Sequence, residues 1–355
     1  MLFLFKEERD NKPKEFYQMI DFEFIKCIAI IELYLKERWI EPKEKNDYPY
    51  SLLYHQTMSY LFGMGAVKPK ELAKNILTLT AFKKIPQEDY KKLLKYLLEK
   101  QELEKDEEGN ILIGMKGERK VNNFQFFSVF STPIEYSVRS GSQEIGTVQT
   151  PYIVGQQFSL AGFTWKVIEI NEEKRHIYVK KVGGISKIAW NDSGEVFVHT
   201  KIVKKMQEVL GSQEEYRYLD NNGIQKLREL RQIANRTNIL KNEIVPIVKG
   251  VFGVFPWLGT KEMLALSFAL KQEGIANQIY YRAGIPIFIE IKTKMKKNEL
   301  EKILKEIKHK EIDKNQFDIP DLLQKTGKYN YMIPKELLKK QFIEDCIDVE
   351  GMQRY

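Results

Sequence analysis

Residues 122–147 read NNFQFFSVFSTPIEYSVRSGSQEIGT, and the pattern of the chain changes at this stretch. Its first half is rich in aromatic and β-branched side chains, which favours strands over a surface helix. The small residues Ser140, Gly141 and Ser142 then supply a turn. We therefore expect a strand pair that opens a β-rich domain, with one helical module before it and another after residue 200.

Three helical segments and a hairpin are expected before this stretch. The helices fall at residues 51–62, 68–77 and 87–100, and a proline followed by two acidic residues marks the start of the third. The polar run 106–110, DEEGN, has the composition of a hairpin turn. Three helices followed by a hairpin is the order of a winged helix, which we predict over residues 51–121. In that arrangement the third helix enters a groove of the nucleic acid.

The rest of the chain completes an α+β multidomain prediction: winged helix, small β-barrel, then a mainly helical domain with a few strands. Short strands alternate with turns through residues 122–200, which favours a small closed or nearly closed barrel. Residues 201–355 combine helical and strand-like segments, and residues 1–50 form a helical lead-in. The lead-in helix has an apolar face at helical spacing, made of Phe24, Cys27, Ile28, Ile31 and Leu35.

Composition and charge place the chain among globular proteins with a basic surface. The 355 residues carry a formal net charge of +8, and residues 201–355 hold most of the surplus, with 28 Lys and Arg against 21 Asp and Glu. A basic surplus favours nucleic acid or another polyanion as the partner. No run of 18 apolar residues is present, and the two cysteines lie far apart. We expect a cytoplasmic protein without a disulfide framework.

No motif for self-contained catalysis is found in the sequence. It contains no phosphate-binding P-loop, no dinucleotide-binding glycine pattern, no zinc-protease helix motif and no nucleophile elbow. The four histidines lack the spacing of metal ligands, and ordinary surface or core positions explain them better. We therefore predict no catalytic residue, no metal and no cofactor in this chain.

Binding of nucleic acid is the function that remains, and three groups of basic residues and the tryptophans are candidates for it. Lysines on the third helix and beside the barrel could neutralise phosphates, as could those at the start of a basic helix over residues 294–310. A solvated helix face is the commoner explanation of such lysines, above all for the basic helix. Trp165, Trp190 and Trp257 could stack on unpaired bases, but core packing is the commoner role of a tryptophan. The candidates are Lys91, Lys92, Lys95, Arg119, Lys120, Trp190, Lys296 and Lys297.

The opening stretch also carries a resemblance. Together with GQQFSLAGFTWKVIEINEEKRHIYVKK, it resembles the post-motor region of large helicase-related (Lhr-type) superfamily 2 DNA helicases. Further similarity lies in FPWLGT near residue 255 and in the closing YMIPKELLKKQFIEDCIDVEG. The matching positions in the first two stretches are Asn123, Phe124, Phe127, Phe130, Pro133, Tyr136, Val138, Ile145, Gly146, Thr147, Gly155, Phe158, Leu160, Gly162, Trp165 and Val167.

This resemblance implies a winged helix, a small β-barrel and a mainly helical domain that grip single-stranded or tailed DNA behind two RecA-like motor domains. Both motor domains, and every ATP-binding motif, are absent from this sequence. ATP and Mg would therefore act only through a motor supplied elsewhere. Within this picture we expect Phe124, Phe127, Phe130 and Tyr136 to hold the barrel against the winged helix.

Three functions are open at this point. The first is a nucleic-acid-binding accessory region of an Lhr-like helicase, with DNA as its partner. The second is a protein-interaction subunit whose apolar segment from Ile28 to Leu35 docks a separate RecA-like motor. The third is an enzyme of the DNA glycosylase kind, which would need a carboxylate beside a base pocket, and the sequence offers no such candidate.

Overall fold

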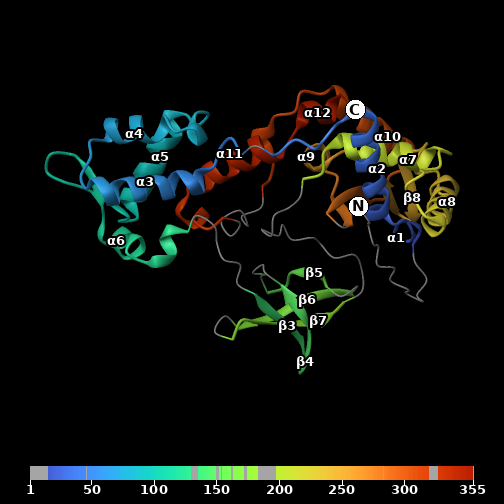
Figure 1. Ribbon diagram of the computed structural model, residues 1–355, viewed down its shortest axis with the longest axis horizontal. Coiled ribbons are helices and arrows are strands. Elements are labelled where there is room, and N and C mark those ends of the chain that lie inside the picture. The colour runs from blue at the N-terminus through green and yellow to red at the C-terminus, as the bar shows by residue number, and fades with distance from the viewer. Residues whose placement is uncertain are drawn as a thin grey trace. The chain divides into compact units, whose positions relative to one another are not determined.

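The structure of this chain is a computed structural model, shown in Figure 1. It describes residues 15–44, 46–128, 135–148, 152, 154–160, 163–171, 174–182, 197–282, 284–319 and 327–354. Over these residues the fold is α+β, as predicted, with helices and three small sheets. The chain divides into two compact units, each built from separate stretches of sequence. Unit 1 comprises Met1–Glu44, Val196–Phe317 and Ile347–Tyr355, and unit 2 comprises Lys45–Glu195 and Asp318–Cys346.

Unit 2 contains a helical module that begins with a helix free of charged residues, α3 (Tyr50–Met64). Val67 then pairs with Ile111 in an isolated antiparallel bridge, so a short extended segment separates α3 from the next helix. The remaining elements of this module are α4 (Pro69–Leu77), η1 (Thr80–Phe82), α5 (Gln87–Glu99), β1 (Leu103–Lys105), β2 (Ile111–Ile113), α6 (Met115–Val121), η2 (Phe124–Phe127), η5 (Asn330–Met332) and α11 (Lys335–Cys346).

The core of this module joins sequence segments that lie more than 200 residues apart. Apolar side chains from α3, α4 and α5 pack together, and Tyr329, Ile333, Leu337 and Leu338 from the far end of the chain complete the same cluster. Residues 327–346 are thus part of this module. Sequence order alone predicts that they belong to the domain over residues 201–355.

The second part of unit 2 is a five-stranded sheet with the order β4-β3-β7-β6-β5. Neighbouring strands are antiparallel, except that β3 and β7 are parallel. Tyr136, Val138, Trp165 and Val167 are among the inward side chains of its core. The strands are β3 (Tyr136–Ser140), β4 (Gln143–Val148), β5 (Gln157–Leu160), β6 (Phe163–Asn171) and β7 (His176–Lys181).

The predicted small β-barrel is wrong in its closure. The two edge strands approach each other closely enough that a Cβ atom built on Gly146 of β4 would lie 3.5 Å from Leu160 Cδ2 of β5. Even so, no hydrogen-bonded pairing joins β4 to β5 in the described part of the sheet. The sheet is therefore curled around its core side chains but open. Alternating strands and turns in the sequence predict the strands, but they do not predict whether the two edge strands pair with each other.

The predicted strand at residues 126–130 is also wrong over the residues that the structure describes. Phe124–Phe127 form a 3₁₀ helix, η2, with Asn123 as its N-cap. Phe126 alone of these phenylalanines is buried, whereas Phe124 and Phe127 are exposed. Neither of these two rings belongs to the core of the helical module or to that of the sheet. Tyr136 packs within the sheet's own core, and Phe130 lies outside the described residues.

Unit 1 is built on a four-stranded antiparallel sheet of order β10-β11-β9-β8. Helix α9 is buried over most of its length, because it packs between this sheet and helices α10 and α12. The strands are β8 (Ile244–Val248), β9 (Val251–Val254), β10 (Asn277–Arg282) and β11 (Ile285–Lys292). The helices are α1 (Phe16–Met19), α2 (Phe22–Glu37), α7 (Thr200–Gly211), α8 (Asn221–Arg236), α9 (Thr260–Gln272), α10 (Lys297–His309), η3 (Lys314–Gln316) and α12 (Val349–Gln353).

The lead-in helix α2 belongs to unit 1, where it packs along α7. Asp21 caps its N-terminus by accepting a hydrogen bond from the Phe24 backbone N–H at 3.1 Å. Phe24 and Ile28 are buried as the periodicity predicts, but Leu35 is exposed. No helix in the described part of the chain is both long and apolar enough to cross a membrane.

Candidate nucleic-acid interface

The three lysines predicted on the third helix lie together on the exposed face of α5. Tyr90, Leu93, Leu94 and Leu97 form the buried stripe of this amphipathic helix. Lys91, Lys92 and Lys95 lie on its opposite side and are all exposed. The structure therefore brings these three candidates onto one surface.

Each of these lysines has a carboxylate partner at the surface. Lys91 Nζ lies 2.6 Å from Glu88 Oε1, and Lys95 Nζ lies 4.0 Å from Glu99 Oε1, both within α5. Lys92 Nζ lies 3.6 Å from Glu336 Oε1 of α11. Exposed pairs of this kind contribute little to stability, about 0–1 kcal/mol. A phosphate that approaches can therefore replace the carboxylate at small cost.

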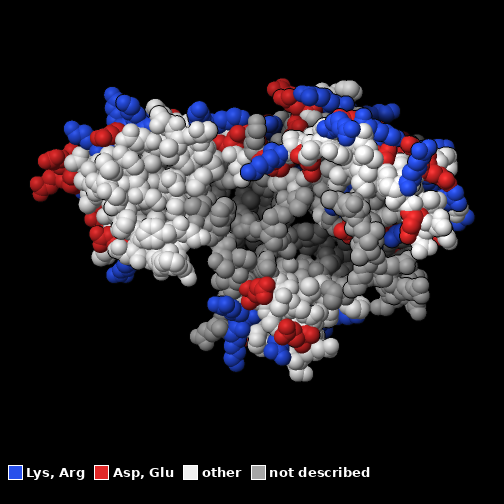
Figure 2. Space-filling view, in the orientation of Figure 1, with Lys and Arg blue, Asp and Glu red and all other residues white. Residues whose placement is uncertain are grey.

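Basic residues extend from α5 to its neighbour α4. Between residues 68 and 100 there are nine lysines against four acidic residues, and one of those acids, Asp89, is buried and paired inside the module. Figure 2 shows Lys and Arg side chains along the edge of the module that carries α4 and α5. This surface, which we call the α4–α5 face, has a net positive charge suited to a phosphate backbone.

The tip of the β1–β2 hairpin has the opposite charge. Asp106, Glu107 and Glu108 are the first three residues of the turn. The Asn110 backbone N–H and side-chain amide both donate to the Asp106 carboxylate at 2.8 Å. The side-chain hydrogen bond from Asn110 holds the pKa of Asp106 below its usual value. An ionised acidic tip repels phosphates, so the α4–α5 face is the better phosphate-binding surface of the two.

Arg119 and Lys120 have different environments although they are adjacent in α6. Arg119 is exposed in the last turn of the helix. Lys120 pairs with the buried carboxylate of Glu102, and its Nζ lies 3.1 Å from Met332 Sδ and 5.2 Å from the centre of the Tyr331 ring. Lys120 therefore anchors the C-terminal segment to the module, which leaves Arg119 as the candidate for ligand contact.

Two of the three tryptophans considered as stacking platforms are buried. Trp165 Nε1 donates to Leu160 O at 2.9 Å, and Trp257 Nε1 donates to Ile239 O at 3.2 Å. These side chains have the core role that is commoner for tryptophan. Trp190 lies outside the described residues.

Lys296 and Lys297 lie in unit 1, at the start of α10. The Lys296 backbone N–H donates to Glu299 Oε2 at 2.7 Å, and Lys297 Nζ lies 3.7 Å from Glu301 Oε1. Further along the helix, Lys302 pairs with Glu306 at 3.8 Å in the same i,i+4 manner. These pairs give α10 a surface of mixed charge, as in an ordinary solvated helix.

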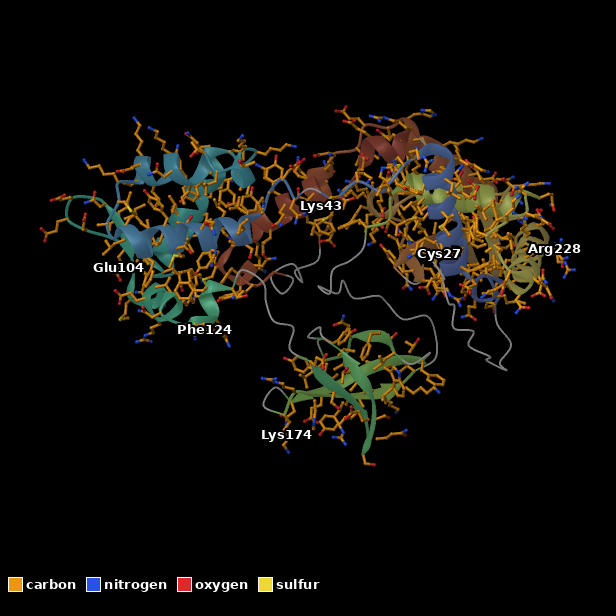
Figure 3. All side chains as sticks on the ribbon, viewed as in Figure 1. Cys27, Lys43, Glu104, Phe124, Lys174 and Arg228 are labelled. Atoms are coloured by element: carbon orange, nitrogen blue, oxygen red, sulfur yellow. The ribbon has the colours of Figure 1, made fainter. Side chains whose placement is uncertain are left out.

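Exposed aromatic side chains of η2 are candidate site residues that the sequence did not predict. Phe124 is 89% exposed and Phe127 is 63% exposed, and Phe62 of α3, whose ring contacts that of Phe127, is 49% exposed. The rings of Phe62 and Phe127 meet edge to face with centroids 6.5 Å apart. Alternating phenylalanines favour a strand in sequence reasoning, so only the observed 3₁₀ helix reveals that two rings face outward. Figure 3 shows Phe124 on the outside of the helical module.

No group of three or more His, Cys, Asp and Glu side chains within the described ranges could hold a metal ion. Comparisons of the chain with models of protein families, with curated proteins and with solved structures find no match.

Proposed function

We propose that this chain is the nucleic-acid-binding accessory region of an Lhr-like ATP-dependent DNA helicase. It grips single-stranded or tailed DNA for a motor that this chain does not contain. The ordered series of sequence similarities supports the helicase part of the proposal. The fold and charge of the helical module in unit 2 support the nucleic-acid part.

The order of elements in that module is the observation that carries the proposal. Helix α3 is followed by the bridge at Val67, by α4 and α5, and then by the β1–β2 hairpin, with Val67 pairing to Ile111 of β2. This is the element order of a winged helix, in which the third helix contacts nucleic acid. Here the third helix is α5, and it presents Lys91 and Lys95 on the α4–α5 face. Topology and charge thus favour the same surface.

In this function the lysines act through phosphate neutralisation. Each lysine that neutralises a phosphate releases condensed counterions, so the affinity falls as salt rises. For single strands the slope of log K against log salt is about −0.7 for each phosphate contact. Contacts of this kind are independent of base sequence, as a translocating motor requires of the part that holds its strand.

Charge reversal with a matched control tests the proposal. Lys95→Glu changes a lysine that is 81% exposed and pairs with a glutamate four residues later. Lys302→Glu on α10 makes the same change at a lysine that is 80% exposed and also has an i,i+4 glutamate. We expect Lys95→Glu to weaken binding of single-stranded DNA and to make the salt dependence shallower, whereas Lys302→Glu leaves both unchanged. Equal effects of the two variants would contradict a specific role of α5.

A second candidate function is docking of a separate motor subunit through α2. Ile28, at the start of the apolar segment that the sequence indicates for docking, is buried against the rest of unit 1. Ile30, Tyr34 and Leu35 are the large hydrophobic residues of α2 that remain exposed. An exposed apolar surface of this kind is typical of interaction sites. Ile30→Asp should therefore abolish co-purification with a motor subunit and leave unit 1 folded.

A further inference from the structure

We propose that Phe124, Phe127 and Phe62 form a stacking platform for the unpaired bases of a single-stranded nucleic acid. We call these three residues the phenylalanine platform. This inference rests on the proposed function, and it adds a base-contacting surface to the phosphate-contacting α4–α5 face. It is independent of the tryptophans considered from the sequence.

The platform has a rigid base, because η2 is held at several points. Phe126 is buried between aromatic neighbours, with its ring centre 4.7 Å from that of His55 and 5.9 Å from that of Tyr329. Its carbonyl oxygen accepts hydrogen bonds from His55 Nε2 at 2.9 Å and from the Tyr329 hydroxyl at 3.1 Å. The short helix therefore has one anchoring phenylalanine in the core.

Two further interactions fix the ends of η2. Asn123 Oδ1 accepts a hydrogen bond from the Gln125 backbone N–H at 2.9 Å and caps the helix. The Lys328 ammonium group donates to the carbonyl oxygens of Gln125 and Ser128. With its backbone held in this way, η2 presents Phe124 and Phe127 in a defined direction at little entropic cost to a ligand.

The surroundings of the platform suit nucleic acid. No Lys, Arg, Asp or Glu occurs between Tyr48 and Val67, so α3, the helix that carries Phe62, contributes none of these charges to the surface. Figure 2 shows a broad surface without charged side chains over α3. Beside η2, the exposed charged residues of α6 are Lys116, Glu118 and Arg119, which are positive in sum.

Flat rings beside cations are the arrangement that binds single strands without sequence preference. Bases stack on aromatic faces, and neighbouring cations neutralise the phosphates between them. An exposed apolar surface with no cations at its border would suit a protein partner better. The net positive charge on α6, the helix that contacts η2, therefore favours unpaired nucleobases as the occupant.

Binding of fluorescently labelled oligonucleotides to the full chain tests the platform. The double variant Phe124→Ala/Phe127→Ala should bind a single-stranded oligonucleotide roughly 25-fold more weakly, at roughly fivefold for each ring. The slope of affinity against salt should stay as in the unmodified chain, because no phosphate contact is lost. An abasic oligonucleotide of the same length should bind both proteins equally.

Single variants separate stacking from general apolar contact. Phe124→Trp keeps a flat ring and should retain the affinity, whereas Phe124→Leu keeps the apolar volume and should lose it. Ile168→Ala, at an exposed apolar residue of the five-stranded sheet, should bind as tightly as the unmodified chain. Because Phe124 and Phe127 are exposed, the thermal unfolding midpoint should be unchanged in their variants.

The outcomes distinguish this inference from the function on which it rests. If the unmodified chain binds single strands in a salt-dependent manner and the double variant binds equally well, the platform is wrong and the proposed function stands. If no form of the chain binds nucleic acid at low salt, both are wrong. If the double variant keeps its affinity but changes its sedimentation coefficient, the phenylalanines form a protein interface and the inference is overturned.

Discussion

Lys340→Met is the substitution whose effect can be worked out most directly from the structure. Asp89 of α5 is buried, and its Oδ2 atom accepts hydrogen bonds from the Tyr50 hydroxyl and from Lys340 Nζ, each at 2.6 Å. Tyr50 belongs to α3 and Lys340 to α11, so three helices meet at one carboxylate. Burial and the hydrogen bond to Asp89 raise the pKa of Tyr50, which therefore stays a donor. Without Lys340, the Asp89 charge keeps a single neutral partner.

The expected cost is about 2 kcal/mol. Removal of one partner from a fully buried ion pair costs about 3–5 kcal/mol, because the remaining charge is left without compensation. Lys340 is 34% exposed at its side chain, so water replaces part of the lost interaction and the cost falls below that range. For a unit of this size, about 2 kcal/mol corresponds to a decrease of about 4–8 °C in the unfolding midpoint.

Hydrogen exchange on the full chain measures this effect where it should occur. Amides of α3 and α5 should lose protection in Lys340→Met, while those of α9 in unit 1 should not change. Lys95→Met is the matched control, because it removes a lysine from the exposed side of α5. The double variant Lys340→Met/Asp89→Asn should recover part of the loss, since the buried charge is gone. Equal protection in Lys340→Met and Lys95→Met would show that the Lys340–Asp89 ion pair does not stabilise this module.

Buried or crowded positions give three further predictions. Burial lowers the pKa of His55 below its usual value, so the unfolded chain protonates this imidazole more readily than the folded chain does. The stability of unit 2 should therefore fall as the pH drops below about 6.5. A urea midpoint that does not change between pH 7 and pH 5 would contradict this. Gly117→Ala should lower the free energy of unfolding by about 2–3 kcal/mol, because the added Cβ would lie 2.3 Å from Glu102 O. Gly63→Ala has open space around the added Cβ and should stabilise α3 by about 0.5–1 kcal/mol. Ile28→Asp should unfold unit 1 in thermal melts because it buries a charge, and Ile30→Asp should not.

The elements that the sequence predicts well are those with strong local signals. The start and the buried stripe of α5 follow from its proline, its acidic first turn and its leucine spacing. For the same reason, the exposure of Lys91 and Lys95 is correctly predicted from helical periodicity. The α+β class also follows from these local patterns.

The parts that the sequence did not predict depend on contacts between distant residues. Phe126 is the buried phenylalanine of η2, and Tyr329, which lies 203 residues later, supplies one of the two hydrogen-bond donors to its carbonyl oxygen and an aromatic neighbour. No local pattern shows this, so the sequence does not distinguish Phe126 from Phe124 and Phe127, which it predicts as part of a joint between the barrel and the winged helix. Similarly, Lys120 has the composition of a phosphate-binding residue, and only its pairing with Glu102 reveals its structural role. Closure of the sheet failed as a prediction because the meeting of two edge strands is not encoded in either strand alone.

The way in which the two units share the chain has a consequence for its synthesis. The backbone passes from one unit to the other four times, near residues 44, 195, 317 and 346. A nascent chain that has left the ribosome up to residue 300 therefore contains neither unit complete, since both still lack helices encoded later. Completion of either unit must wait for nearly all of these 355 residues. Pulse-proteolysis of stalled nascent chains should accordingly show full protection of each unit appearing late, and for both units within a short interval of chain length.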